Sequence, residues 1–328
     1  MNEFVRRHSI LQTTVLVLLA ACALLAASCG RSPWTIQWQA ESASLLSTSA
    51  ADPEHVWAAG GGPVYFFDGV SWRKQVEGLS PEPLDVSAAD PAHVWAVGGD
   101  GSGVVYFFDG TDWNRQFETA DSSMSCVAAA DATHAWAVGA NEGASNIYSF
   151  DGNSWSLMYS APLHVQDMTA TDAQHAWFVA EAPGGGSAVY SLEGASWSKA
   201  YQTPEGEVLF GVDASDPAHV WAVGTGGSEV SSGEGTGSGG GVFFFDGKRW
   251  DRRFLTAEEL HRVAAADAGH TWFAGGIGLK GPIYFCDGRT LVRQYQSAEA
   301  LFDITAPDAD HAWAVGGLGG VFIYDPGR

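Results

Sequence analysis

Seven histidines stand out in this sequence because each follows an aspartate by three residues and precedes a tryptophan by two. Histidine beside a carboxylate suits acid–base catalysis or metal binding. These pairs recur at one position of a repeat, so we expect them to be spread around the molecule and not to converge on one site. We therefore predict a structural role, hydrogen-bonding near the aspartate turn, for His55, His93, His134, His175, His219, His270 and His311.

A second repeat position carries the more informative chemistry. Five residues before each repeat aspartate the chain has a polar and varied residue, whereas the next residue is apolar or nearly so and is expected to be core. Three carboxylates and one guanidinium at this position can coordinate a cation such as Ca²⁺ or hold a polar ligand. The alternative is a solvated channel that tolerates these groups. The candidate ligand-binding residues are Asp85, Asp167, Arg262 and Asp303.

The elements that position these residues are seven repeats. The pattern Asp-x-x-His-x-Trp occurs seven times, and its tryptophans are residues 57, 95, 136, 177, 221, 272 and 313. A second motif, of the type VYFFDGVSW (64–72), follows each copy. Each repeat predicts four short strands, in which the aspartate forms a turn before the second strand and Asp-Gly forms a hairpin before the fourth. The repeats begin near 45, 84, 124, 165, 208, 260 and 301.

Four antiparallel strands, repeated seven times, predict an all-β fold, a seven-bladed β-propeller covering residues 29–328. The seventh repeat stops before its fourth strand, and residues 34–39 (WTIQWQ) resemble the missing one. We therefore expect the N-terminal strand to pair near Phe322–Tyr324 and close the ring, which removes an exposed sheet edge. The repeat tryptophans and tyrosines are expected to pack between blades.

The repeats resemble the broad WD40/YVTN/BNR-like group of propellers over about residues 31–328. The D-G-x-x-W segment resembles a shortened Asp-box, and the VGG…Y…W order resembles a Kelch repeat. The resemblance implies the fold. It implies no particular function, because propellers include enzymes, ligand binders and scaffolds.

The N-terminus has the pattern of an export signal. Arg6 and Arg7 precede the apolar residues 9–27, so we interpret residues 1–28 as a signal peptide. Cys22 and Cys29 each follow small residues and resemble the lipid-modified cysteine of a bacterial lipobox, and the sequence leaves both open. An uncleaved membrane anchor is the alternative. Either interpretation places the protein outside the cytoplasm, attached to a membrane of a bacterial cell envelope.

Composition restricts the partners. The formal net charge of −22 disfavours binding to phosphate backbones, so no nucleic acid is expected. Cys126 and Cys286 fall on strands of different blades, so neither a disulfide between them nor a nucleophilic role is expected. The Gly-rich connection 224–241 is interpreted as a surface insertion, with a ligand lid as the alternative. No enzyme motif such as G-x-S-x-G or H-E-x-x-H is present.

These observations predict an exported, lipid-anchored monomer that serves as a binding or scaffold module for a protein or polar ligand, with no cofactor apart from calcium at the channel mouth. The alternative is an extracytoplasmic enzyme that acts on glycans or another polar substrate there.

Overall fold

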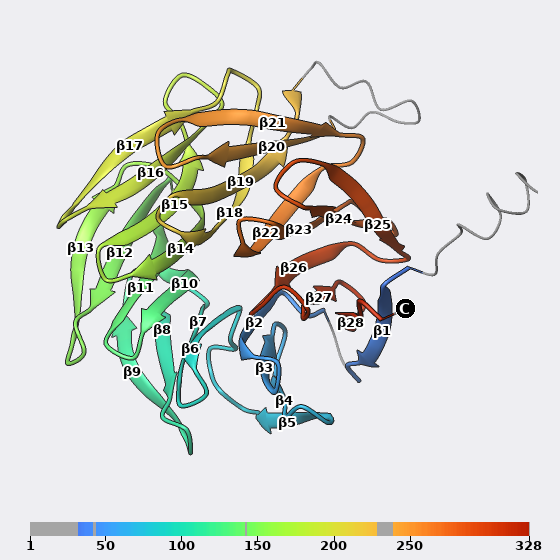
Figure 1. Ribbon diagram of the computed structural model, residues 1–328. Coiled ribbons are helices and arrows are strands. Elements are labelled where there is room, and N and C mark those ends of the chain that lie inside the picture. Colours follow the sequence, from blue (N-terminus) through green and yellow to red (C-terminus); the bar gives the residue numbers. More distant parts are fainter. Residues whose placement is uncertain (1–31, 42–43, 142, 228–238, 328) are drawn as a thin grey trace, which may run out of the picture.

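The computed structural model describes residues 32–41, 44–141, 143–227 and 239–327. These residues form seven antiparallel sheets of four strands each, and the sheets surround a common axis (Figure 1). The first strands of the blades contact one another in a closed ring. The predicted seven-bladed β-propeller is therefore confirmed. The signal segment, Cys22, Cys29 and most of the 224–241 connection lie outside the described residues. Within the described part of the chain, no helix is long and apolar enough to cross a membrane.

The innermost strand of each blade faces the axis, and the second strand lies beside it. The inner strands are β2 (Ser47–Asp52), β6 (Asp85–Asp90), β10 (Ser123–Asp131), β14 (Val165–Asp172), β18 (Leu209–Asp216), β22 (Leu260–Asp267) and β26 (Leu301–Thr305). The second strands are β3 (His55–Ala59), β7 (His93–Gly99), β11 (His134–Asn141), β15 (His175–Glu181), β19 (His219–Thr225), β23 (His270–Gly275) and β27 (Trp313–Gly316).

The third strands and the outer strands complete the blades. The third strands are β4 (Val64–Phe67), β8 (Gly103–Phe108), β12 (Ala144–Phe150), β16 (Ser187–Glu193), β20 (Gly240–Phe245), β24 (Gly281–Cys286) and β28 (Gly320–Tyr324). The outer strands are β5 (Trp72–Val76), β9 (Trp113–Thr119), β13 (Trp155–Ala161), β17 (Ser196–Gln202), β21 (Trp250–Thr256), β25 (Leu291–Ser297) and β1 (Trp34–Gln39).

The turn between the first and second strands follows the predicted chemistry. In the first blade, Asp52 Oδ1 accepts the backbone N–H of Glu54 at 2.8 Å, and His55 Nδ1 lies 2.8 Å from the same oxygen. The same two contacts recur in all seven blades. Burial opposes ionisation of Asp90, but the bonds from Ala92 and His93 outweigh it and lower the pKa of that carboxyl. The histidines therefore brace turns, as the repeat pattern predicts.

Tryptophans of the second strands form the core between blades. Trp57, Trp95, Trp221, Trp272 and Trp313 are almost completely buried. Trp57, for example, packs in one cluster with residues of the next blade, including Val86 and Phe108. Because large aromatic side chains bury the most apolar area, these contacts hold adjacent blades together.

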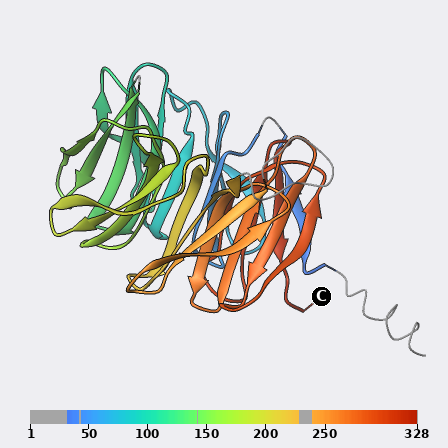
Figure 2. The same ribbon diagram turned by 90° about the horizontal axis from the view of Figure 1, so that it is seen from above.

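The N-terminal strand closes the ring. Strand β1 pairs antiparallel with β28, with Trp34 opposite Tyr324 and Ile36 opposite Phe322. Trp34 is 1% exposed. The blue strand lies beside the red strands of the last blade in both views (Figures 1 and 2). The last blade is thus built from both ends of the described chain, as predicted.

Candidate functional site

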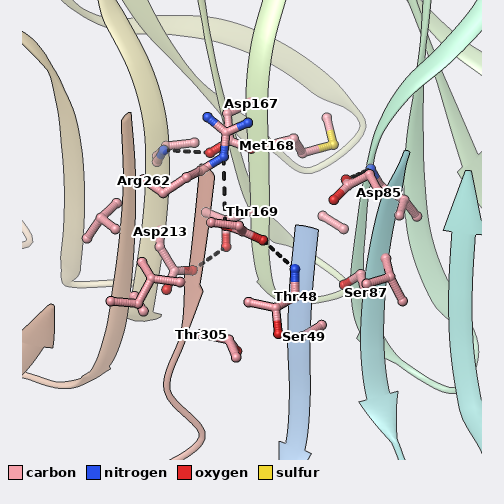
Figure 3. Close-up of a pocket in the computed structure, with 18 of the residues that line it drawn as sticks. Thr48, Ser49, Asp85, Ser87, Asp167, Met168, Thr169, Asp213, Arg262 and Thr305 are labelled. Atoms are coloured by element: carbon pink, nitrogen blue, oxygen red, sulfur yellow. Dashed lines mark hydrogen bonds and ion pairs between the residues drawn. The ribbon is translucent and has the colours of Figure 1, made fainter. Parts of the chain in front are cut away.

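All four candidate residues lie at one mouth of the central channel. Asp85, Asp167, Arg262 and Asp303 line a cavity of about 470 Å³ formed by the first residues of the inner strands. The connections between blades, and those between the second and third strands, meet at this end of the propeller. A smaller polar cavity of about 210 Å³ continues down the axis, and side chains from several blades point into it (Figure 3). The structure therefore brings together the four residues that the sequence predicted at the channel mouth.

The three aspartates also join blades. Asp303 Oδ2 accepts the backbone N–H of Thr48 at 2.7 Å, Asp85 Oδ2 that of Val127 at 2.8 Å, and Asp167 Oδ2 that of Val212 at 3.0 Å. In each case the donor belongs to the inner strand of the following blade. An inner strand is the edge of its sheet, so one row of its N–H groups has no partner within the blade. A side chain of the preceding blade supplies that partner.

A second tier repeats this arrangement two residues further along. The hydroxyls of Ser49, Ser87 and Thr305 accept backbone N–H groups of the next blade at 3.0–3.2 Å. Asp213 Oδ2 accepts the N–H of Ala265 at 2.9 Å, and its other oxygen accepts the hydroxyl of Thr169 at 2.8 Å. Sequence reasoning missed this tier. Strand alternation could have predicted it, because side chains two residues apart in a strand point to the same side of the sheet.

Arg262 has a different role because a guanidinium only donates. Its Nη1 donates to the carbonyl oxygens of Phe210 and His261, both at 3.0 Å, and its Nε lies 3.8 Å from Asp303 Oδ1. At the same repeat position in the preceding blade, Gly211 has no side chain. A Cβ there would lie 2.5 Å from the carbonyl oxygen of His261, so glycine allows the two strands to approach.

The carboxylates of the mouth are unusually easy to protonate. Burial raises the pKa of Asp303 to about 7 and that of Asp167 to about 6, although Arg262 opposes both shifts. Burial also raises the pKa of Asp85. The three carboxylates raise the pKa of Arg262, against the effect of its own burial. With three carboxyl groups and one guanidinium, the acidic groups at the mouth outnumber the basic one. Ionisable groups in a cleft with shifted pKa values are typical of functional sites.

The geometry of the described residues supports neither a metal site nor a reactive cysteine. Among the described residues, no group of three or more His, Cys, Asp or Glu side chains is arranged to hold a metal ion, so calcium at the mouth remains a prediction. Cys126 and Cys286 are both buried and unpaired with each other. Burial raises the pKa of the Cys126 thiol well above its usual range. A thiol that is rarely ionised is a poor nucleophile.

An apolar pocket adjoins the mouth. It encloses about 410 Å³ and shares His261 and Phe302 with the channel cavity. Its rim carries Ile277, Leu279 and Leu318, whose exposed fractions are 65%, 71% and 62%. The buried carboxylate of Glu299 accepts the backbone N–H of Leu318 at 2.5 Å and so fixes the loop that presents this side chain. We call this the rim pocket. The repeat pattern does not predict the rim pocket, because its residues lie in connections of different repeats.

Comparisons with known proteins support the fold. No protein-family model matches the sequence, and no curated protein matches it. Among solved structures, the chain is similar to YCF48 bound to a D1 peptide, at 18% identity and a TM-score of 0.68, over 90% of this chain and 98% of that one. It is similar to YCF48 from Cyanidioschyzon merolae at 16% identity and a TM-score of 0.65, over 90% and 99%.

The WD40 repeats of RRP9 give 11% identity and a TM-score of 0.64, over 89% of this chain and 97% of that one. At these identities the likeness shows the fold. The chain is a seven-bladed β-propeller with WD40-like structural neighbours.

Proposed function

We propose that this propeller is a binding module that captures a polypeptide segment at the channel mouth. The observation that carries the proposal is the rim pocket, where three largely exposed apolar side chains, Ile277, Leu279 and Leu318, surround a cavity beside the mouth. Clustered exposed apolar side chains with polar surroundings are typical of interaction sites. One neighbour of similar fold is a complex with a peptide, which agrees with this proposal.

The mouth supplies the second part of the recognition. Asp85, Asp167 and Asp303 outnumber the single cation Arg262, and the whole chain carries a formal charge of −22. A negative cleft attracts basic groups and raises their association rate. The partner segment therefore has an apolar side chain that enters the rim pocket and a neighbouring lysine or arginine that reaches the mouth.

Binding of labelled peptides tests the proposal. Fluorescence anisotropy would compare peptides that combine leucine or phenylalanine with lysine or arginine at increasing spacing. Leu279→Asp and Leu318→Asp should each weaken binding at least about tenfold, because they place a charge in the contact. Val70→Asp is the matched control, since Val70 is 88% exposed in a turn at the opposite end of the blades. Equal binding by all three variants would refute the site.

The enzyme alternative is supported by the raised pKa values of Asp167 and Asp303, which suit a general acid. Each of these carboxylates already accepts a backbone N–H of the next blade. A carboxylate that is held by this hydrogen bond between blades is poorly placed to transfer a proton to a substrate, so we favour binding.

We also propose that the module acts outside the cytoplasm, held at a membrane by a lipid on Cys22 or Cys29. The basis is the N-terminal pattern of Arg6, Arg7 and an apolar run that ends in small residues.

A further inference from the structure

The outer strands of the propeller share one irregularity. Each contains a β-bulge, a residue without a partner in the pairing with the third strand. In four blades the bulged residue is a glutamine. These are Gln37, Gln75, Gln116 and Gln294.

Three of these glutamines bridge two tryptophans of adjacent blades. Gln116 Oε1 accepts the indole N–H of Trp95 at 2.9 Å and that of Trp155 at 2.7 Å. Gln75 and Gln37 make the corresponding pairs of bonds, at 2.8–3.1 Å. One donor lies on the second strand of the same blade and the other begins the outer strand of the next. The carboxamide oxygen therefore occupies a site built by two converging indole donors.

The fourth blade has the same site without its glutamine. Its bulged residue is Ala200, between Lys199 and Tyr201. A cavity of about 450 Å³ lies there, and Trp177 and Trp250, the two tryptophans at the equivalent positions, line it together with Ala200. Within the described residues, neither indole N–H has a hydrogen-bond partner. The place that a glutamine side chain fills in other blades is open between the fourth and fifth blades.

The two indoles keep the orientation that they have in the glutamine-containing blades. Trp250 lies 5.6 Å from Phe245 at an interplanar angle of 32°, and Trp155 lies 5.5 Å from Phe150 at 32°. On the other side, His175 and Trp177 are 6.4 Å apart at 21°, and the equivalent pair of the first blade is 6.5 Å apart at 23°. These matching ring contacts support the same placement of the two indoles in the fourth and fifth blades.

The charges around the cavity favour a neutral group. Lys248 and Arg249 lie at its edge with Glu193. Arg249 is engaged by Asp251 at 3.4 Å, which leaves one lysine against one glutamate. The remaining wall is mostly apolar, with Leu192, Pro217 and Phe245. Such a pocket suits an aliphatic stem that ends in a carbonyl and carries no net charge.

We propose that this cavity binds the side-chain carboxamide of a glutamine presented by a partner polypeptide, with its oxygen accepting the indole N–H groups of Trp177 and Trp250. The site lies at the turn ends of the blades, away from the rim pocket, and does not depend on the proposed function of the mouth. Gln116 shows the binding geometry expected for this ligand, because its carboxamide oxygen accepts the two equivalent indole N–H groups.

Indole ¹⁵N–¹H NMR spectra of the whole protein test the proposal. The probe is the capped tripeptide Ala-Gln-Ala, with Ala-Ala-Ala and Ala-Glu-Ala as comparison peptides. We expect the signals of Trp177 and Trp250, assigned through Trp177→Phe and Trp250→Phe, to shift with the glutamine peptide at millimolar concentration, since small fragments bind weakly. No shift, or an equal shift with the glutamate peptide, would overturn the assignment of a carboxamide site.

Ala200→Gln is the decisive variant. It should fill the cavity with an internal glutamine, abolish the peptide-induced shifts and leave the melting temperature unchanged or higher, because two donors gain an acceptor. Gln116→Ala is the reciprocal variant and should create a second site, seen as new shifts of Trp95 and Trp155. Persistence of the original shifts in Ala200→Gln would place the peptide elsewhere and refute the proposal.

Discussion

The carboxylate of Asp303, in the seventh blade, accepts the backbone N–H of Thr48, in the first, at 2.7 Å. This bond joins the two blades that meet where the ring closes. The bond gives a partner to a backbone N–H at the edge of β2. The carboxylate that accepts it is only 14% exposed and is close to the acidic groups of Asp85 and Asp167. The same residue thus stabilises the ring through its hydrogen bond and destabilises it through its charge.

Asp303→Asn should separate these two effects, because asparagine keeps an acceptor oxygen and removes the charge. The folded-state pKa, about 7, lies above the ordinary value of 3.8. The stabilisation due to the protonated form is therefore complete below about pH 4 and is lost as the pH rises through 7. The variant should exceed the wild type in unfolding free energy by about 1–4 kcal/mol at pH 8. The gain should shrink between pH 7 and 4.

Urea unfolding at pH 8, 6 and 4 measures this difference. Asp112→Asn, at an exposed position of the turn before β9, is the control for removing a carboxylate that is not buried. A loss of stability in Asp303→Asn at pH 8 would mean that the attraction between Asp303 and Arg262 outweighs burial.

Met158→Gln should stabilise the third blade. Met158 is the bulged residue of β13, where four of the other blades have glutamine. Within the described chain, the buried indole N–H groups of Trp136 and Trp197 have no partner. Glutamine has nearly the same length as methionine and offers both donors an acceptor. An unpaired buried donor costs about 1–3 kcal/mol, so we expect a gain of about 1–2 kcal/mol in chemical unfolding.

The reverse substitution, Gln116→Met, provides the matched comparison, because it removes the acceptor from Trp95 and Trp155. It should lower the melting temperature. If both variants destabilise the protein equally, shape complementarity and not hydrogen bonding governs the bulge position.

Removal of the N-terminal strand should open the ring. Deletion of residues 31–40 exposes the edge of β28 and removes Trp34, whose ring packs 5.7 Å from that of Tyr324. Loss of a buried aromatic costs on the order of 3–5 kcal/mol. Trp34→Ala retains the strand and should account for most of that loss. Equal melting temperatures for the wild type and the deletion variant, measured by circular dichroism, would contradict closure by β1.

The double variant Asp85→Asn with Asp167→Asn tests the mouth. Both asparagines can still accept the N–H groups of Val127 and Val212, so the fold should persist. Binding of a basic peptide should weaken, because the attraction loses two charges. Calorimetric titration with calcium, before and after the two substitutions, tests the calcium predicted at the mouth. Heat in the wild type that the double variant abolishes would support it, and no heat in the wild type would refute it.

Replacement of both Cys22 and Cys29 by serine should abolish labelling with a radioactive or clickable fatty acid. The single replacements should identify the cysteine that carries the lipid, because the thiol is the acceptor of the modification. If the double variant still fractionates with membranes, the uncleaved anchor replaces the lipid as the means of attachment.

Periodicity by itself determined the architecture. The seven Asp-x-x-His-x-Trp copies specify seven turns, each closed by aspartate and histidine, and local chemistry of this kind needs no distant partner. The missing fourth strand of the last repeat and the spare segment 34–39 specified the ring closure, because an open edge is unfavourable. The repeat position of Asp85, Asp167, Arg262 and Asp303 sufficed to place them around one axis.

Only the tertiary structure decided what these positions do. The sequence could not show that Asp303 bonds to Thr48, because the donor is an edge N–H of another blade, 255 residues away in the chain. It could not reveal the rim pocket, which assembles Leu279 and Leu318 from connections of different blades. Nor could it reveal that Ala200 leaves a cavity between Trp177 and Trp250. The contacts of a bulged residue depend on which indole of the neighbouring blade packs beside it, and that is set by the tertiary structure.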